Sequence, residues 1–359
     1  MTAESSRGLA TGAAAGSAPS PTSPPGATAD SPLQLPKAAW IQVVKRVWTM
    51  AGLHELGLLS AGVAFYVFMA MTPLIAATVM IYGLVGDVRA VHDQMQRIVE
   101  VVPADAARLI EGQLLGAVTT SKDVVGLALA VALAFAIYGG MRAASGLMSA
   151  LNIINEERET RGLVSLSARA VLLTLAAVAI ALVGLLSGGI FAWLQTQTSV
   201  YLGEWTSFLF KLLTWIAAIA LGSTGFVLVM RYGPDRRPAK WRWLIPGSLL
   251  STLLWIAVSF GFSLYVAYVS NYSATYGSLS AIVVFLMWLF LSAYGVLLGA
   301  LLNAEIERQT VCDTTAGPAM PMGERGAVLA DLAEGDLSMV QLLEKRARRE
   351  ARRNRPKVT

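Results

Sequence analysis

The feature that most constrains this sequence is a long stretch, from Trp243 to Ala304, that contains no charged residue. A soluble domain does not carry such a stretch, because about a quarter of its residues are charged. A membrane-spanning helix needs about 20 apolar residues, so the stretch is long enough for two spans. Between them lies SNYSATYGS at 270–278, which is rich in turn-forming residues. We therefore predict an integral membrane protein.

Four apolar segments precede this stretch, and the chain as a whole is 55% hydrophobic and only 14% charged. We predict an all-α fold: a polytopic membrane helical bundle with six transmembrane helices. Mixed charges and two short apolar patterns in 87–123 predict an extracytoplasmic helical hairpin between the first two spans. The transmembrane domain is expected over 57–308, with spans at about 58–85, 124–150, 170–194, 208–230, 244–268 and 279–302.

The segments outside the bundle differ in composition from it and from each other. Residues 1–36 are small and polar, so they are expected to be disordered. Residues 37–56 predict an amphipathic interfacial helix, whose Lys37, Lys45 and Arg46 would reach lipid phosphates. A short helix packed on the bundle is the alternative. Residues 309–359 are expected to be a cytoplasmic linker and a basic tail.

The distribution of lysine and arginine predicts the orientation of the spans. The loop from Arg231 to Arg242 is rich in both residues, whereas the connections 196–207 and 269–278 have none. Six spans with both termini in the cytoplasm place these loops consistently. We expect a multi-pass protein of the bacterial inner membrane.

Small residues in the first two spans indicate close helix contacts. In the first span, Ser60, Gly62, Tyr66 and Pro73 form a candidate packing or groove-lining set. The last three recur at helical spacing and are expected to share one face. This face either packs against other helices or lines a transport path. The second span carries a stripe of small residues that likewise indicates a close helix contact. The stripe is formed by Gly139, Ala143, Gly146 and Ala150.

Several polar residues at the ends of spans are further candidates for the groove or for packing. Arg142 either extends to the cytoplasmic interface or faces a cavity. Asn303 and Glu305 would pair with Arg142 or cap the last span. Tyr276 and Gly277 would form a turn and a helix start. The remaining candidates follow the second span: Asn152, Glu159 and Arg161.

No motif for catalysis or cofactor binding is present, and we expect no catalytic residue, no metal and no cofactor. The chain has two histidines and one cysteine, too few for a histidine- or cysteine-rich metal site. Glu156, Glu157 and Glu159 could form a carboxylate metal site, but the prediction is that they solvate the helix end. The expected partners are membrane lipids, with anionic lipid at the basic tail and no nucleic acid. A homo-oligomer is left open.

Three motifs, in their order and spacing, make the chain resemble the YihY/BrkB family of bacterial membrane proteins. They are SAGVAFYVFMAMTPL at 60–74, ALNIINEERETRG at 150–162 and TYGSLSAIVVFLMWLFLSAYGVLLGALLNAEIER at 275–308. Two positions depart from the family pattern: Leu301 replaces a common glutamate, and Asn155 a common aromatic residue. The glutamate's role therefore cannot be carried over. The resemblance implies an inner-membrane location.

The activities that this family has been given differ widely: ribonuclease, serum-resistance factor, envelope lipid transporter and cation/proton exchanger. From the residues we favour a transporter or translocation factor for a lipid or another envelope component. The alternatives are a cation/proton antiporter, which needs titratable groups within the spans, and a non-catalytic membrane scaffold. Ribonuclease activity is not expected, because no catalytic site is visible in the sequence.

Overall fold

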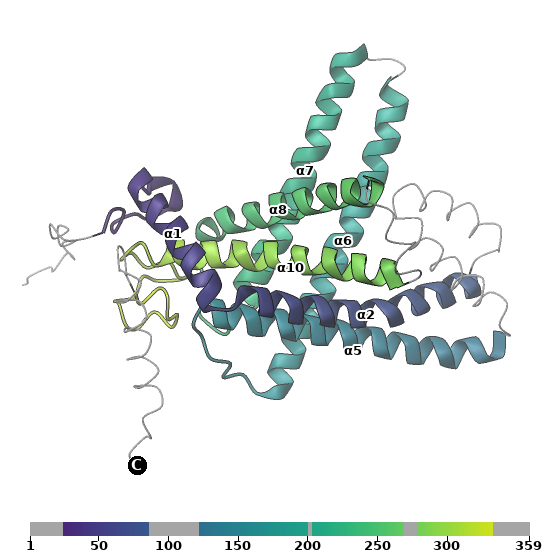
Figure 1. Cartoon of the computed structure of the whole chain (residues 1–359), viewed down its shortest axis with the longest axis horizontal. Helices are drawn as coiled ribbons and strands as arrows, with labels where there is room; N and C mark the ends of the chain where they lie inside the picture. The colour runs from purple at the N-terminus through teal and green to yellow at the C-terminus, as the bar shows by residue number, and fades with distance from the viewer. Residues whose placement is uncertain (1–23, 86–121, 200–202, 269–278, 333–359) are drawn as a thin grey trace, which may run out of the picture.

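A computed structural model describes residues 24–85, 122–199, 203–268 and 279–332, and these ranges are built from helices (Figure 1). The all-α prediction is confirmed for them. After the short 3₁₀ helix η1 (Pro32–Gln34) come α1 (Lys37–Leu53), α2 (Leu56–Val85), α5 (Lys122–Ile154), α6 (Leu163–Ser199), α7 (Gly203–Tyr232), α8 (Trp241–Tyr268) and α10 (Leu279–Glu307).

Five of these helices, α5 to α8 and α10, are long and apolar enough to cross a membrane. The helix α1 and the segment Leu56–Met71 of α2 pass the same criteria together, with a bend of 65° between them. The bend lies at Glu55, whose positive φ of 50° breaks the helical path between them. The predicted spans all fall within helices. The expected hairpin at 87–123, the turn with Tyr276 and Gly277, and the basic tail lie outside the described residues.

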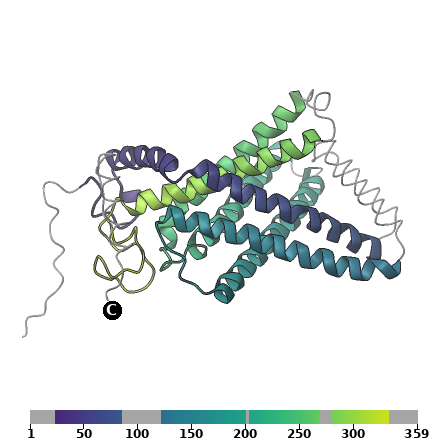
Figure 2. The same cartoon turned by 60° about the horizontal axis from the view of Figure 1, so that its bottom comes forward.

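The connections that are described lie at one end of the bundle (Figures 1 and 2). We call this the polar end and define it by the α5–α6 connection 155–162, the α7–α8 connection 233–240 and the segment 308–332. The helix α1 lies beside it and contacts α10.

The stripe of small residues in the second span makes a close helix contact, as expected, and the structure shows that its partner is α2. A β-carbon added to Gly139 would lie 2.7 Å from the Cα of Ala70. One added to Gly146 would lie 3.0 Å from the ring of Tyr66. Ala150 is buried. The missing side chains therefore allow α2 and α5 to approach closely.

Gly62 does not belong to this contact, and the expectation that it shares the packing face of Tyr66 and Pro73 is wrong. It is exposed, and no atom lies within 4 Å of a β-carbon built on it. Ser60 and Ala64 are the small residues that α2 buries. Gly62 lies about 200° around the helix from Ser60, because each residue adds about 100°. Small residues occur on several faces of α2, so composition did not identify the buried one.

The closest helix crossing brings α8 against α10. A β-carbon on Gly247 would overlap the carbonyl oxygen of Gly299, so the two backbones are in contact. Pro246 lies within α8 and cannot donate a backbone hydrogen bond. Asn303 of α10 supports this turn: it accepts a hydrogen bond from the Gly247 N–H at 2.7 Å and donates one to the Leu244 carbonyl at 3.0 Å.

Two segments predicted to be loose are packed in the structure. The expected disorder of 1–36 is wrong for 24–36, where Ala27, Ala29 and Leu35 are buried. The hydroxyl of Thr310 donates to the carbonyls of Ala27 and Ala29. The expected linker also packs at the polar end, where Leu329 is buried. Small residues suffice in both segments because their backbone groups bond to each other.

The crossing of α8 and α10 yields a stability prediction. Gly247→Ala would force the two backbones apart, and we expect a lower thermal unfolding midpoint in detergent and a smaller yield of folded protein. Gly62→Ala is the matched control in a helix, because its new methyl group meets no atom. That control should equal or slightly exceed the wild type, since alanine favours helix more than glycine does. Equal stability of Gly247→Ala and the wild type would contradict the crossing.

Candidate functional site

The first cluster of polar contacts at the polar end ties α1 to the end of α10. The Arg46 guanidinium donates to the Glu305 carboxylate at 2.8 Å, to the Glu305 carbonyl at 2.9 Å and to the Gln309 side chain at 2.8 Å. The Arg46 and Glu305 side chains are only 5% and 1% exposed. Arg308 continues the chain of charges, since it lies 3.7 Å from Glu305 and pairs with Glu156.

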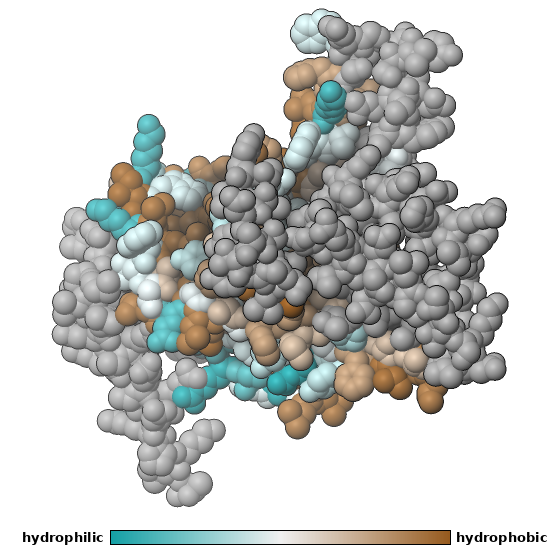
Figure 3. Space-filling view, turned by 45° about the vertical axis from the view of Figure 1, so that its right-hand side comes forward, coloured by the Kyte–Doolittle hydropathy of each residue, from teal (hydrophilic) through white to brown (hydrophobic). Residues whose placement is uncertain are grey.

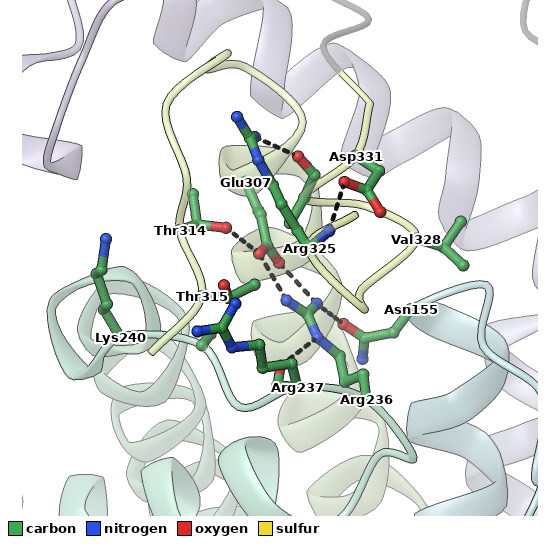
Figure 4. A network of polar contacts seen from close by, with 12 residues as sticks. Asn155, Arg236, Arg237, Lys240, Glu307, Thr314, Thr315, Arg325, Val328 and Asp331 are labelled. Atoms are coloured by element: carbon green, nitrogen blue, oxygen red, sulfur yellow. Dashed lines mark hydrogen bonds and ion pairs between the residues drawn. The ribbon is translucent and has the colours of Figure 1, made fainter. Parts of the chain in front are cut away.

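The second cluster surrounds Glu307 (Figure 4). Arg236, from the α7–α8 connection, donates two hydrogen bonds to its carboxylate, at 2.6 and 2.7 Å, and a third to Asn155 at 2.9 Å. Thr314 donates to the same carboxylate. Burial opposes the charge of Arg236, but Glu307 outweighs it and raises the pKa of the guanidinium. Arg236 therefore keeps its charge although it is buried.

The third cluster joins the two connections and contains three of the predicted residues. Asn152 donates to Glu159 at 2.9 Å and accepts from the Asp235 N–H at 2.7 Å. Arg161 binds Glu159 with two hydrogen bonds of 2.5 Å and also donates to the Gly233 carbonyl. The hydrogen bond from Arg161 lowers the pKa of Glu159. The cluster holds the connections together, which is a packing role.

Glu157 differs from its neighbours because it has no ion pair in the described part of the chain. Its carboxylate accepts a hydrogen bond from the Val328 N–H at 2.7 Å and so touches the segment 308–332. Burial raises the pKa of Glu157 to about 7, although this hydrogen bond and the charge of Arg236 act in the opposite direction. Glu157 is thus a group that titrates near neutral pH at the contact with that segment.

A small cavity of about 20 Å³ lies among α5, α7, α8 and α10 at the polar end. It has room for about one water molecule. The Nε of Arg231 is buried without a hydrogen-bond partner among the described residues, and a water in this cavity would supply one. The cavity is too small for a lipid or a metabolite. Its lining is Leu151, Asn155, Met230, Arg231, Arg236, Ala239, Leu244, Ala300, Asn303, Ala304 and Glu307.

Arg142 and Tyr66 form a separate contact on the side of the bundle. The Arg142 guanidinium lies over the Tyr66 ring, 5.4 Å from its centre. The expected pairing of Arg142 with Asn303 or Glu305 is wrong, because both bind groups at the polar end. Ser60 bonds to the carbonyl of Leu56, one turn earlier in its own helix. Pro73 lies within α2, which continues through it.

The network depends on residues that the sequence reasoning missed or misplaced. Arg46 was expected to reach lipid phosphate and instead points into the bundle. Its position offered a signal, because it falls at helical spacing with Val43 and Met50, which are also buried. Arg236 and Arg308 gave no such signal, since basic residues at a span end are ordinarily solvated. Their partners come from segments far away in the sequence.

The Arg46–Glu305 pair predicts a non-additive effect of mutation. Arg46→Leu leaves a buried carboxylate short of a partner, and breaking a buried pair costs about 3–5 kcal/mol. Arg46→Leu combined with Glu305→Leu removes both charges and should destabilise less than the two single changes added together. Thermal unfolding in detergent measures this. Lys45→Leu, at an exposed neighbour, is the control and should have little effect. Strict additivity would contradict the pairing.

Glu157 predicts how stability depends on pH. Its pKa is raised from 4.5 to about 7, so the folded state binds this proton more tightly than the unfolded state. The stabilisation is fully present below about pH 4.5 and is lost as pH rises to about 7. Glu157→Gln keeps an acceptor for Val328 and should gain stability relative to the wild type between pH 5 and pH 8.

Glu159→Gln is the control, because the pKa of Glu159 is lowered and its titration falls below this window. Its stability difference from the wild type should stay constant between pH 5 and pH 8. Parallel pH profiles for the wild type and Glu157→Gln would contradict the assignment.

Comparison with known proteins gives a match to a family model described as Virulence factor BrkB, over residues 47–322. The putative ribonuclease-like protein YfkH of Bacillus subtilis is 28% identical over 274 residues, which cover 74% of this chain and 95% of that protein. A UPF0761 membrane protein of Idiomarina loihiensis is 31% identical over 165 residues, or 45% of this chain and 56% of that protein. No solved structure matches. The family match runs from the second half of α1 through α10 and includes most of the polar end, so the chain belongs to the Virulence factor BrkB family of membrane proteins.

Proposed function

We propose that this protein moves a phospholipid or another amphiphile of the bacterial envelope. The observation that carries the proposal is the separation of α7 from α8 away from the polar end. Figure 1 shows α6 and α7 leaning away from α8 and α10. Figure 3 shows brown, apolar side chains, beside pale and teal ones, where this helix pair rises at the top of the molecule.

The side chains along one face of α7 are buried near the polar end and exposed further from it. Near the polar end this face packs toward α8: Ser223 lies 3.1 Å from Thr252, and Met230 is buried. Residues at helical spacing continue the same face toward the start of α7. There Trp215, Leu212 and Phe208 are 58%, 46% and 57% exposed. An apolar face that is buried at one end and open at the other is suited to an acyl chain.

The helix α6 adds to this open surface. Ala170 is the one buried residue among those of α6 whose side chains the structure describes. The pair α6–α7 is therefore attached to the bundle chiefly near the polar end. In a membrane, lipid or a second copy of the chain must cover the surface that remains. We propose lipid, because this surface is apolar and lies within the spans.

The alternatives have less support. A cation/proton antiporter would need carboxylates within its spans. The helices α2, α6 and α8 have no Asp or Glu, and the carboxylates of α5, α7 and α10 lie only near helix ends. A ribonuclease would need converging catalytic groups. Glu156 and Glu159 pair with Arg308 and Arg161, and Glu157 bonds to Val328. Within the described residues, no group of three or more His, Cys, Asp or Glu side chains lies close enough together to hold a metal ion. We therefore propose a protein that acts without catalysing a reaction.

The orientation that we propose places the polar end in the cytoplasm of a bacterium, with the protein in its inner membrane. Arginine and lysine are abundant at that end, in the connections 155–162 and 233–240. Both termini would then be cytoplasmic. The basic segment 344–357 lies outside the described residues, and from its sequence we propose that it contacts anionic lipid rather than nucleic acid.

Transport can be tested with a bulky label on the exposed face of α7. Cys312 is the chain's single cysteine, so Cys312→Ser gives a cysteine-free background. Leu212→Cys in that background, labelled with a bulky thiol reagent, should obstruct the face between α7 and α8. We expect slower transfer of a fluorescent phospholipid between the leaflets of proteoliposomes, followed by quenching from outside.

The control is Leu213→Cys, labelled identically. Leu213 is 53% exposed but lies about 100° around α7, away from the face that meets α8. Its label should leave transfer unchanged. Transfer no faster than in protein-free vesicles, or equal inhibition by both labels, would overturn the proposal.

A further inference from the structure

The exposed face of α5 changes from apolar to polar side chains at Arg142. Toward the start of the helix this face carries Val131, Phe135 and Tyr138, which are 47%, 61% and 59% exposed. These apolar and aromatic side chains fit contact with lipid tails. Arg142 is the next residue of the same face and is also exposed, and Ser149 follows two turns later.

The position of Arg142 along α5 matches the edge of a bilayer. The helix begins at Lys122, and the chain from there to Arg142 carries no other basic residue. Twenty residues of helix rise about 30 Å, which is the thickness of the hydrocarbon core. If Lys122 lies at one boundary, Arg142 lies at the other, on the side of the polar end. Lipid phosphates are found at that depth.

Tyr66 holds the guanidinium of Arg142 in place. The ring lies against Gly146, whose missing side chain leaves room for it, and the guanidinium lies over the ring 5.4 Å from its centre. A guanidinium stacked on an aromatic face keeps its N–H groups free at the edge. Those N–H groups match two oxygens of a phosphate.

The charge of Arg142 has no counter-charge among the described residues. No carboxylate of the described ranges lies within 4 Å of the Arg142 guanidinium. The guanidinium contacts the ring of Tyr66 instead. Arg46, Arg161, Arg236 and Arg308 each pair with a carboxylate. An exposed arginine at the membrane boundary attracts an anion, and the anion that a bilayer supplies there is a lipid phosphate.

We propose that Arg142 and Tyr66 form a binding site for the phosphate of a phospholipid headgroup in the leaflet on the side of the polar end. The acyl chains of this lipid would lie along Tyr138, Phe135 and Val131. The site requires only that the chain is embedded in a membrane, so it does not depend on the transport proposal.

Native mass spectrometry of the full chain in detergent tests the site, with phosphatidylglycerol as the probe. We expect Arg142→Gln to weaken phosphatidylglycerol binding at least tenfold, or about 1.4 kcal/mol. Diacylglycerol with the same acyl chains should bind the wild type and Arg142→Gln equally. Tyr66→Phe should bind like the wild type, because the ring face and not the hydroxyl holds the guanidinium. Tyr66→Leu should weaken binding.

Arg169→Gln is the matched control, because Arg169 is an exposed arginine of the neighbouring helix α6. It should retain full affinity. If Arg142→Gln does not fold, Arg142→Lys keeps the charge without the planar fork and should still lose affinity. Unchanged binding by both Arg142 variants, or an equal loss in Arg169→Gln, would overturn the site. Full competition by sn-glycerol 3-phosphate would assign it to a soluble phosphate and overturn the lipid.

Discussion

Buried charge at the end of α10 fixes how the surrounding segments are arranged. Glu305 and Glu307 are two residues apart and therefore point about 200° apart around the helix. Glu305 faces Arg46 of α1, and Glu307 faces Arg236 of the α7–α8 connection. A buried charge without a partner costs several kcal/mol, so each carboxylate accepts only an arrangement that brings its arginine close. The order of charges in one turn of helix thus determines which segments meet there.

This arrangement concentrates packing at one end of the molecule. The crossing of Gly247 and Gly299, the Asn303 bridge and the ion pairs all lie within a few turns of the polar end. Further along, α7 presents exposed Phe208 and Leu212 where it would otherwise contact α8. A bundle fastened at one end allows its other end to separate at low cost, because lipid can solvate the apolar side chains. This contrast is the physical basis of the proposed transport function.

The sequence predicted the parts of the structure that depend on local composition. Long apolar segments predicted the spans, and the spacing of Gly139 and Gly146 predicted a close helix contact, although not that its partner is α2. The role of Gly62 could not be predicted in this way, because α2 is apolar all round and its small residues face several directions. The pairs Arg46–Glu305 and Arg236–Glu307 could not be predicted either, since their members are far apart in the chain. Composition also suggested disorder over 1–36 and a linker that begins at 309, whereas backbone hydrogen bonds and small buried residues give order to 24–36 and 309–332.

The two proposed lipid contacts lie on different helices, α7 for transport and α5 for the site at Arg142, and can therefore be right or wrong independently. Gly140 packs against Thr174 of α6, and it marks the side of α5 that faces the separating pair α6–α7. Arg142 lies about 200° around the helix from Gly140, so its guanidinium is turned away from that pair. A lipid held at Arg142 is thus part of the outer lipid layer, not cargo in the opening. It would set the depth of α5 in the membrane.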